Sequence, residues 1–272
     1  MGKKVILITG ASSGMGKISA EELIKNGHIV YGAARNVKHM DSLVKLGGHT
    51  LSMDVTKESD LEKGVDKIIK EQGRIDVLWN NAGYGLYGPV EEVDLKDARY
   101  QFEVNLFGLA RLTQLILPHM RKQKSGTIIN TSSVGGKVYT PLGAWYHATK
   151  HAVEGFSDCL RLELAQFGIN VVVLEPGVIK TGFSNVLIEK MGQKHNAGPY
   201  KNIVKAIVYS SQKINRGEMG SDPSVISQTI KKIINSKKPK TRYLVGQFSS
   251  LANIRKFVSD RLFDKIIMSQ IK

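Results

Sequence analysis

Six short apolar segments recur along the first two thirds of the chain, each separated from the next by a longer stretch of mixed polarity. Most are rich in Val, Ile and Leu and show little alternation; they span residues 4–9, 28–34, 49–55, 74–83, 126–133 and 170–176. Short runs that are apolar on both faces are typical of strands buried within a parallel sheet. The pattern therefore predicts six parallel strands.

The stretches between these segments carry apolar residues at helical spacing. Two of them, Gly16–Gly27 and Asp60–Gly73, end on a glycine, the residue that most often terminates a helix. Strands that alternate with helices through right-handed crossovers predict an α/β fold, a doubly wound parallel sheet of the Rossmann type.

Beyond the sixth predicted strand the pattern changes within what we expect to be a single domain. Residues 1–183 form the predicted core, 184–220 a helical lid, and 221–272 C-terminal helices, with Asp222 as N-cap and Pro223 as first helical residue. An insertion after a strand of such a sheet overhangs the carboxyl edge, where ligands bind.

Composition narrows the class of protein. The chain has 272 residues, of which 42% are hydrophobic, so it can build a large core and is not a disordered protein. Its one cysteine, Cys159, excludes an internal disulfide. No apolar run approaches the ~20 residues needed to span a bilayer, and the first residues lack a cleavage-site pattern. We expect a cytoplasmic protein.

The formal charge of +15 is compatible with nucleic acid, an anionic membrane or a phosphorylated cofactor as partner. No nucleic-acid partner is expected, because no basic run is interleaved with aromatic residues and no zinc-finger or RNA-binding signature is present. The end of the chain, 251–272, is basic and amphipathic. We expect it to be a docked terminal helix, and a membrane-surface role is the alternative.

A glycine-rich turn follows the first predicted strand and opens the first predicted helix. Its glycines are Gly10, Gly14 and Gly16. Glycine permits a tight turn and close approach of the backbone to a pyrophosphate, whose charge then lies at a helix N-terminus. The alternative is a turn that only packs helix against strand. The position between strand and helix favours a nucleotide site.

The end of the second strand indicates which nucleotide. Ala34 stands where an NAD-binding fold carries an acidic residue, and Arg35 follows. An arginine can hold a 2′-phosphate through charge-assisted hydrogen bonds, which predicts NADP(H). Asp54, at the end of the third strand, is placed to accept from the adenine amino group; a turn aspartate is the alternative.

The chain contains two Tyr-x-x-x-Lys pairs, Tyr146 with Lys150 and Tyr209 with Lys213. With the three glycines, the segment NNAG at 80–83 and the first of these pairs in order, the chain resembles the short-chain dehydrogenase/reductase family from Lys3 to about Phe183. A narrower likeness to the 17β-hydroxysteroid and retinol dehydrogenase-like group rests on TSSVGG, PGVIKTGF and the basic C-terminal extension.

The resemblance separates the two pairs. It implies a catalytic serine at a strand end, and Ser133 lies thirteen residues before Tyr146. Tyr209 has Asn196 at the same distance and no strand before it. We therefore expect the pair at 146 and 150 to be catalytic and the other to be one face of a lid helix.

The resemblance also implies the roles of these residues. Tyr146 would act as general acid/base, although a free tyrosine has a pKa near 10. Lys150, one helical turn away, is expected to lower that pKa and to bond the nicotinamide ribose. Ser133 would hold the substrate oxygen. Asn105 would relay protons to Lys150 through water; a buried residue that bonds backbone is the alternative.

By the same resemblance NADP(H) is the cofactor. The residues expected to bind it lie in the glycine turn and at later strand ends: Gly10, Ser12, Ser13, Gly14, Met15, Gly16, Arg35, Asp54, Val55, Asn81, Ala82, Gly83, Tyr146, Lys150, Pro176, Gly177, Ile179 and Thr181. A homodimer or homotetramer is implied as well. His147 and His151 have the spacing of a zinc pair but lack a third ligand, so no metal is expected.

The candidate substrate pocket is aromatic and apolar, and its residues are Tyr84, Leu86, 134–136, Tyr139, Trp145 and Phe183. This favours a hydrophobic alcohol or ketone, such as a steroid, retinoid or acyl-lipid carbonyl, and NADP(H) favours its reduction. Two alternatives stay open: a non-catalytic NADP(H)-binding sensor or scaffold, and a membrane-surface lipid carbonyl reductase.

Overall fold

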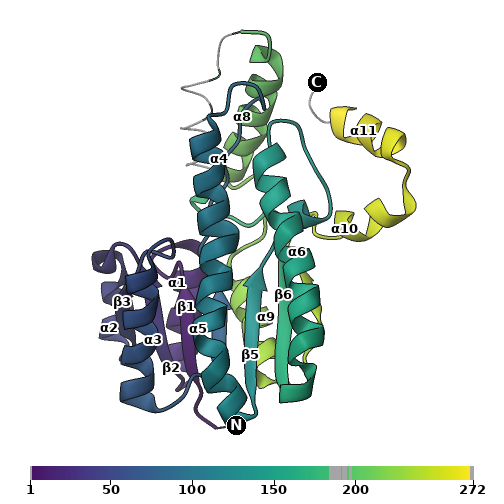
Figure 1. Cartoon of the computed structure of the whole chain (residues 1–272). Coiled ribbons are helices and arrows are strands. Elements are labelled where there is room, and N and C mark those ends of the chain that lie inside the picture. The colour runs from purple at the N-terminus through teal and green to yellow at the C-terminus, as the bar shows by residue number, and fades with distance from the viewer. Residues whose placement is uncertain (1, 184–190, 192–194, 196–197, 270–272) are drawn as a thin grey trace.

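The computed structural model describes residues 2–183, 191, 195 and 198–269, and its centre is a parallel sheet (Figure 1). The described strands are ordered β3-β2-β1-β4-β5-β6-β7. Their bounds are β1 Val5–Thr9, β2 Ile29–Ala34, β3 His49–Ser52, β4 Val77–Asn80, β5 Gly126–Thr131, β6 Ile169–Pro176 and β7 Arg242–Val245. All neighbouring pairs are parallel. The predicted doubly wound α/β fold is confirmed.

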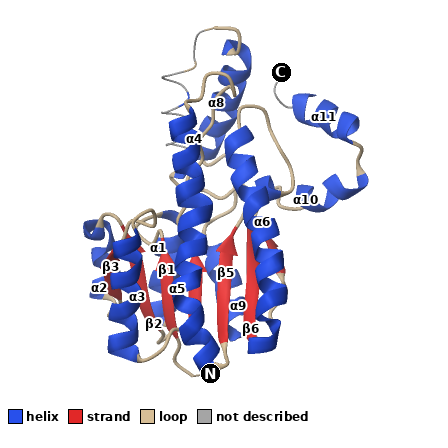
Figure 2. Ribbon diagram, in the orientation of Figure 1, coloured by secondary structure: helices blue, strands red, loops and turns tan. Residues whose placement is uncertain are grey.

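Helices cover both faces of the sheet (Figure 2). One face packs against α1 Gly14–Lys25, α2 Asp41–Lys45 and α9 Ser224–Asn235, and the other against α3 Glu58–Gln72, α5 Gly108–Gln123 and α6 Ala144–Leu164. The cause is visible in β1, where Ile6 and Ile8 enter one core cluster while Val5 and Leu7 enter the other. Successive side chains of a strand point to opposite faces, so an uninterrupted apolar run supplies two cores.

Several elements lie beyond the carboxyl ends of the strands. They are α4 Leu95–Phe102, a π-helical turn Glu103–Phe107, α8 Lys201–Asn215, α10 Leu251–Ile254 and α11 Asp260–Ser269. Helix α8 belongs to the predicted lid; residues 184–190, 192–194 and 196–197 of that lid lie outside the described residues. No helix in the described part of the chain is long and apolar enough to cross a membrane.

The C-terminal segment differs from the prediction of helices alone. Residues Arg242–Val245 form the edge strand β7, which pairs with β6. The strand was missed because it is short, opens on a charged residue and is only partly buried. The preceding helix, α9, begins at Ser224, one residue later than predicted, and the carboxylate of Asp222 accepts a hydrogen bond from the Ser224 amide at 2.8 Å.

Strands β1 and β4 are tied together just beyond their paired residues. The hydroxyl oxygen of Thr9 accepts hydrogen bonds from the backbone amides of Asn81 and Ala82, each at 3.0 Å. Thr9 is only 2% exposed, so water cannot replace this acceptor. The tie fixes the loop after β4 against the loop after β1, where the glycine-rich turn begins.

Replacing Thr9 with Val keeps the shape of the side chain but removes the acceptor shared by two amides. We expect the free energy of unfolding in urea to fall by about 1–3 kcal/mol, the cost of leaving buried donors unpaired. Thr9→Ser, which keeps the hydroxyl, is the control and should lose clearly less. Equal losses in the two variants would mean that packing of the methyl group, and not the hydrogen bonds, holds the loops together.

Candidate active site

The glycine-rich turn is packed so closely that two of its positions exclude a side chain. Gly10 has a φ of +67°, and a Cβ placed there would lie 2.9 Å from the Cα of Ala82. A Cβ at Gly16 would lie 2.5 Å from the Gly10 carbonyl oxygen. The two glycines are therefore required by close packing of the turn itself and against the loop after β4, the role given as the alternative. The turn also leads into the N-terminus of α1, where an anion such as a pyrophosphate is favoured.

Asn81 lies against this turn and offers one unpaired acceptor. Its side-chain amide donates to the carbonyl oxygens of Thr9 at 3.0 Å and Gly10 at 3.3 Å. Its Oδ1 atom is buried and has no hydrogen-bond partner among the described residues. A buried acceptor without a donor is rare in folded proteins. A ribose hydroxyl would supply the missing donor, so the residues present fit a nucleotide.

The segment after β6 returns to the same place. A Cβ at Gly14 would lie 3.4 Å from Thr181, so Thr181 borders the glycine turn. Ile179 is buried in the core on the α1 side. Gly177 fits closely against the chain at Gln247, and the Pro176 carbonyl accepts a hydrogen bond from Ser133. The structure thus gathers residues that are far apart in the sequence at one edge of the sheet.

The remaining residues predicted for the cofactor lie along the same edge. Arg35 is exposed directly after β2. Ser12 and Ser13 lie in the turn after β1, and β1 is the neighbour of β2 in the sheet. Asp54 forms the turn given as its alternative, because its Oδ1 accepts from the amide and hydroxyl of Thr56. The carbonyl of Val55 packs against Gly108 at the start of α5.

Tyr146 lies in the first turns of α6 and is surrounded by rings. It is 8% exposed, and its ring centroid is 5.6 Å from that of Tyr87 and 5.7 Å from that of Phe183. Ser133 is close enough to act on its hydroxyl, and it lowers the pKa of Tyr146. Ser133 follows β5 by two residues, and its Oγ accepts a hydrogen bond from the Gly135 amide at 3.0 Å. The structure therefore brings the two predicted hydroxyls near one another.

Lys150 is one turn further along α6 and is also buried, at 6% exposure. Its ammonium donates to the carbonyl of Thr131 at 2.8 Å and lies 5.9 Å from the centroid of the Tyr146 ring. The position of a Cβ on Gly83 would be 3.8 Å from the same ammonium. The Lys150 ammonium thus lies between the Tyr146 ring and the loop after β4.

Burial has the larger effect on the acidity of both groups. Loss of solvent raises the pKa of Tyr146, and the hydrogen bond from Ser133 opposes that rise. The pKa of Lys150 is lowered to about 8, because burial lowers it more than the negative charge of Glu154 raises it. Burial and Ser133 are the causes of the shift at Tyr146. The expectation that Lys150 lowers the pKa of Tyr146 stays a prediction.

Glu154, which the sequence argument did not select, links Lys150 to a buried charge network. It is 4% exposed and forms ion pairs with Lys137 at 2.9 Å and Arg242 at 3.1 Å. Glu175 of β6 lies beside it, and burial together with the Glu154 charge raises the pKa of Glu175. Spacing was the available signal, since Glu154 is four residues after Lys150 and shares its helical face.

Asn105 occupies the π-helical turn between α4 and α5. Its Oδ1 accepts from the Tyr84 amide at 3.1 Å, and its Nδ2 donates to the Tyr84 carbonyl at 3.0 Å and the Thr149 hydroxyl at 3.1 Å. This is the backbone-bonding arrangement given as its alternative. It holds the loop after β4 against α6, beside Lys150.

His147 is a structural residue of α6. Its Nε2 accepts from the Thr140 amide at 3.1 Å, so its Nδ1 carries the proton and donates to the Gly135 carbonyl at 2.9 Å. Both nitrogens are used within the segment that connects Ser133 to Tyr146. Within the described residues, no group of three or more His, Cys, Asp or Glu side chains is arranged to hold a metal ion.

The apolar wall beside Tyr146 differs in part from the predicted one. Phe183 contributes as predicted, but Tyr139 turns away to bond Asp264 at 3.0 Å. Trp145 lines a hollow beside α4 instead. The sequence argument missed Tyr87, which packs on Tyr146 and on a small cluster of Leu142, Met191 and Val204 that includes residues of α8. The predicted lid helix thus brings apolar side chains towards the tyrosine.

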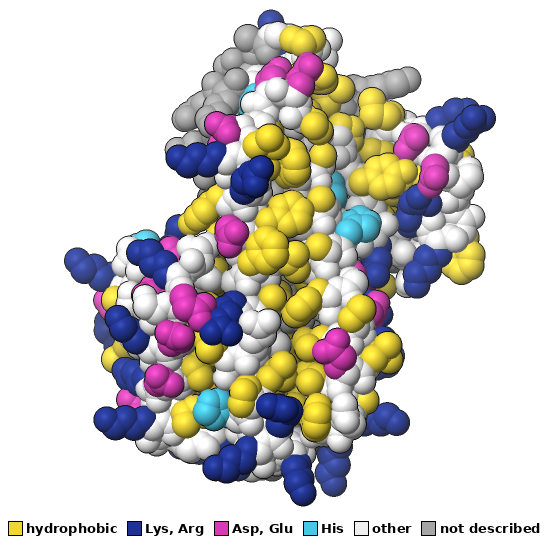
Figure 3. Space-filling model, in the orientation of Figure 1, with side chains coloured by type: hydrophobic (Ala, Val, Ile, Leu, Met, Phe, Trp, Pro, Cys, Tyr) yellow, Lys and Arg dark blue, Asp and Glu magenta, His cyan; other side chains and the backbone are white. Residues whose placement is uncertain are grey.

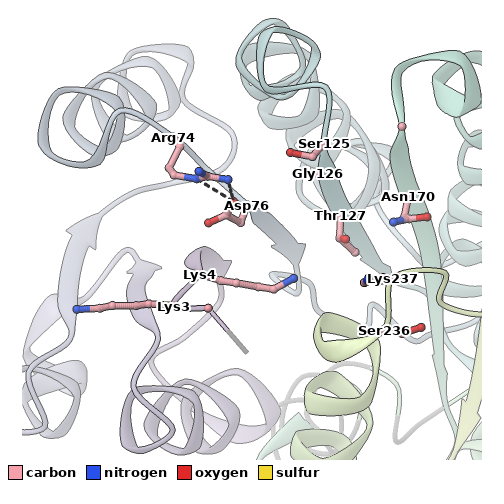
Figure 4. A pocket seen from close by; sticks show the side chains of 12 residues that line it. Lys3, Lys4, Arg74, Asp76, Ser125, Gly126, Thr127, Asn170, Ser236 and Lys237 are labelled. Carbon is pink, nitrogen blue, oxygen red and sulfur yellow. Dashed lines mark hydrogen bonds and ion pairs between the residues drawn. The ribbon is translucent and has the colours of Figure 1, made fainter.

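The second tyrosine and lysine pair is remote from these contacts. Tyr209 is 54% exposed on α8, with the Lys213 ammonium 4.8 Å from its ring centroid. Another hollow, at the opposite edge of the sheet, is lined by Lys3, Lys4, Arg74 and Asp76 among others (Figure 4). Tyr209 is excluded by its exposure to solvent, and this hollow by its place at the amino ends of the strands, because ligands of such sheets bind at the carboxyl ends. Neither feature belongs to the candidate site.

Known proteins share this architecture and sequence. The chain is 38% identical over 247 residues to the 3-ketodihydrosphingosine reductase of Bacteroides thetaiotaomicron, covering 90% of this chain and 89% of that one. It is 32% identical over 280 residues to an NADPH-dependent 3-dehydrocapnine reductase of Ornithobacterium rhinotracheale, with 98% and 96% covered. A short-chain dehydrogenase structure from Streptomyces avermitilis superposes with a TM-score of 0.80 at 30% identity, covering 98% and 99%.

The family model described as short chain dehydrogenase matches residues 4–192. That span holds the glycine-rich turn, Ser133, Tyr146 and Lys150, and it covers more than half of the chain. The resemblance predicted from the motifs is thereby confirmed at the level of the family, while the narrower hydroxysteroid and retinol dehydrogenase-like group is not. The chain belongs to the short-chain dehydrogenase/reductase family of oxidoreductases.

Proposed function

We propose that this oxidoreductase transfers a hydride from NADPH to the carbonyl carbon of a hydrophobic ketone, with Tyr146 as the proton donor. The observation that carries the proposal is the buried side chain of Tyr146, close to Ser133 and followed one helical turn later by the buried ammonium of Lys150. The alternative of a sensor or scaffold does not account for this set of groups.

Reduction of a ketone forms a C–H bond and an O–H bond. A bound nicotinamide supplies the hydride. Ser133 and Tyr146 hold the carbonyl oxygen by two hydroxyls, and Tyr146 gives its proton to that oxygen as negative charge develops there. Burial keeps the pKa of Tyr146 high, so the hydroxyl is protonated at neutral pH, the form that a reduction needs. The positive charge of Lys150 stabilises the tyrosinate that remains.

The cofactor residues divide by the part they would hold. The glycine-rich turn at the N-terminus of α1 suits the pyrophosphate, and the unpaired Oδ1 acceptor of Asn81 suits a ribose hydroxyl. Arg35 is the cation proposed for the 2′-phosphate. Support for NADP(H) comes from the absence of an acid at Ala34 and from the relative named as NADPH-dependent.

Two observations support a hydrophobic ketone as substrate. The rings of Tyr87 and Phe183 pack beside the Tyr146 ring, and the cluster of Leu142, Met191 and Val204 continues this apolar surface from Tyr87. The relative from Bacteroides thetaiotaomicron is named as a reductase of a 3-keto compound. We therefore propose an apolar ketone, with a lipid-like carbonyl as the leading class.

Tyr146→Phe removes the proton donor and leaves the ring packing intact. We expect NADPH binding, followed by cofactor fluorescence, to stay within about twofold, while ketone-dependent NADPH oxidation falls by at least about a hundredfold. Tyr209→Phe is the matched control, because it changes the same residue type in the other Tyr-x-x-x-Lys pair and should retain turnover. Turnover in the Tyr146 variant would refute the assignment.

Arg35→Asp exchanges the proposed 2′-phosphate ligand for an acid. We expect the ratio of kcat/KM for NADPH to that for NADH to fall by about tenfold to a hundredfold, which corresponds to loss of one or two charge-assisted hydrogen bonds. Lys45→Asp on α2 makes the same change in net charge away from the turn. If both variants shift the ratio equally, the preference reflects overall charge and not Arg35.

Glu154→Gln removes the negative charge that keeps Lys150 protonated. Since Glu154 raises the pKa of Lys150 from a value already lowered by burial, its loss should move the alkaline limb of kcat/KM to lower pH, by about one unit. The groups that face Glu154 are Lys137, Arg242 and Glu175.

Asp158→Asn provides the control for this shift. Asp158 pairs with Arg242 at 2.7 Å, as Glu154 does, but it is not among the charges acting on Lys150. Its variant should leave the alkaline limb in place. An unchanged limb in Glu154→Gln would show that Lys150 does not govern the activity at high pH.

A further inference from the structure

The C-terminal arm, defined as residues 251–269, stands away from the sheet beyond α6 (Figure 1). It comprises α10, a short turn and α11. Phe263 is its most buried large side chain: it is 1% exposed and packs edge-on against Tyr139 with 5.1 Å between ring centroids. The Arg255 guanidinium lies 5.2 Å from the Phe263 ring and 5.6 Å from the Tyr139 ring.

Both acidic residues of α11 are engaged in polar contacts. Asp264 accepts a hydrogen bond from the Tyr139 hydroxyl, and Asp260 pairs with Arg255. Asp264 thus ties α11 to Tyr139, whereas the pair of Asp260 with Arg255 lies within the arm. Both carboxylates are exposed, but each already has a partner.

The arm also exposes apolar and basic side chains to solvent, and these together are called its outward face. Its apolar members are Ile254, Phe257, Leu262, Ile266 and Met268, with exposures of 48%, 88%, 51%, 41% and 44%. Its basic members are Lys256, Arg261 and Lys265, which are exposed as well. Figure 3 shows basic, apolar and acidic side chains together on this projecting part of the molecule.

We propose that this outward face of the arm binds an anionic lipid bilayer surface. A helix with apolar and basic residues on one exposed face lies in the interface of a membrane, where the apolar side chains enter the headgroup region and the cations meet lipid phosphates. Phe257 is 88% exposed, so the hydration of its apolar ring is unfavourable, and insertion into the headgroup region would remove the ring from water.

Charge decides between a bilayer and a second copy of this chain. A two-fold contact through this face would bring Arg261 and Lys265 of one molecule against the same residues of the other. Both acids that could offset them are engaged with Tyr139 and Arg255. The chain also carries a formal charge of +15. Repulsion therefore disfavours self-association and favours a negative surface.

Sedimentation with lipid vesicles tests the proposal on the full-length protein. We expect binding to vesicles of phosphatidylcholine with about one third phosphatidylglycerol, weakened by salt, and little binding to phosphatidylcholine alone. Replacing Lys256, Arg261 and Lys265 with Gln should weaken binding roughly a hundredfold, at about fivefold per cation. Phe257→Ser should weaken it about tenfold.

Matched controls separate a specific face from general positive charge. Lys45, Lys63 and Lys122 are exposed on three other helices, and their triple Gln variant lowers net charge equally. Leu162→Ser changes a side chain that is 73% exposed on α6. Both should bind within about threefold of the unaltered chain. Thermal melts should show all variants folded, because the residues changed are exposed.

Three outcomes would overturn the proposal. The unaltered chain could fail to bind anionic vesicles, the two triple variants could weaken binding equally, or Phe257→Ser could convert an oligomer into a smaller species in light scattering. The last result would assign the face to a second copy of the chain. Vesicle binding is measured without turnover, so a failure here leaves the proposed reaction untouched.

Discussion

The buried ammonium of Lys150 is the constraint on which much of the site depends. A cation removed from water is stable only when other groups replace its hydration. Here the Thr131 carbonyl of β5 and the charge of Glu154 do so. Glu154 is held in turn by Lys137 and by Arg242 of β7. The edge strand β7 thus helps to stabilise the positive charge of Lys150, because Arg242 pairs with the Glu154 carboxylate that acts on it.

Successive turns of α6 consequently provide different environments along one helical face. At Glu154, opposite charges are buried together, and the proximity of Glu154 raises the pKa of Glu175 by disfavouring two adjacent negative charges. Two turns earlier, Tyr146 meets aromatic and apolar groups, and desolvation raises its pKa. Lys150 lies between these two environments, so the protonation of Tyr146 and that of Lys150 depend on different neighbours along the same face.

Sequence patterns predicted what depends on local order and missed what depends on distant contacts. The uninterrupted runs Val5–Thr9 and Ile169–Pro176 identified buried strands, because both faces of each strand must be apolar. Motif order and the distance of thirteen positions from Ser133 to Tyr146 selected the pair that the structure places, buried, beside the loop after β4. Strand β7 was missed because it opens on Arg242, a residue of the network. Tyr139 was misplaced in the pocket, since its partner Asp264 lies 125 residues away and no periodicity reveals such a contact.

The segment from Ser133 to Thr140 connects the site to the arm. At its inner end Ser133 lies near Tyr146, and His147 holds Gly135 and Thr140 against α6 through its two nitrogens. At its outer end Tyr139 packs against Phe263 and Arg255 of the arm. One short segment thus carries both the hydroxyl proposed to hold the substrate oxygen and the ring on which α11 is anchored. If the arm binds lipid as proposed, fixing it would also restrict this segment, because packed and hydrogen-bonded groups connect Tyr139 to Ser133.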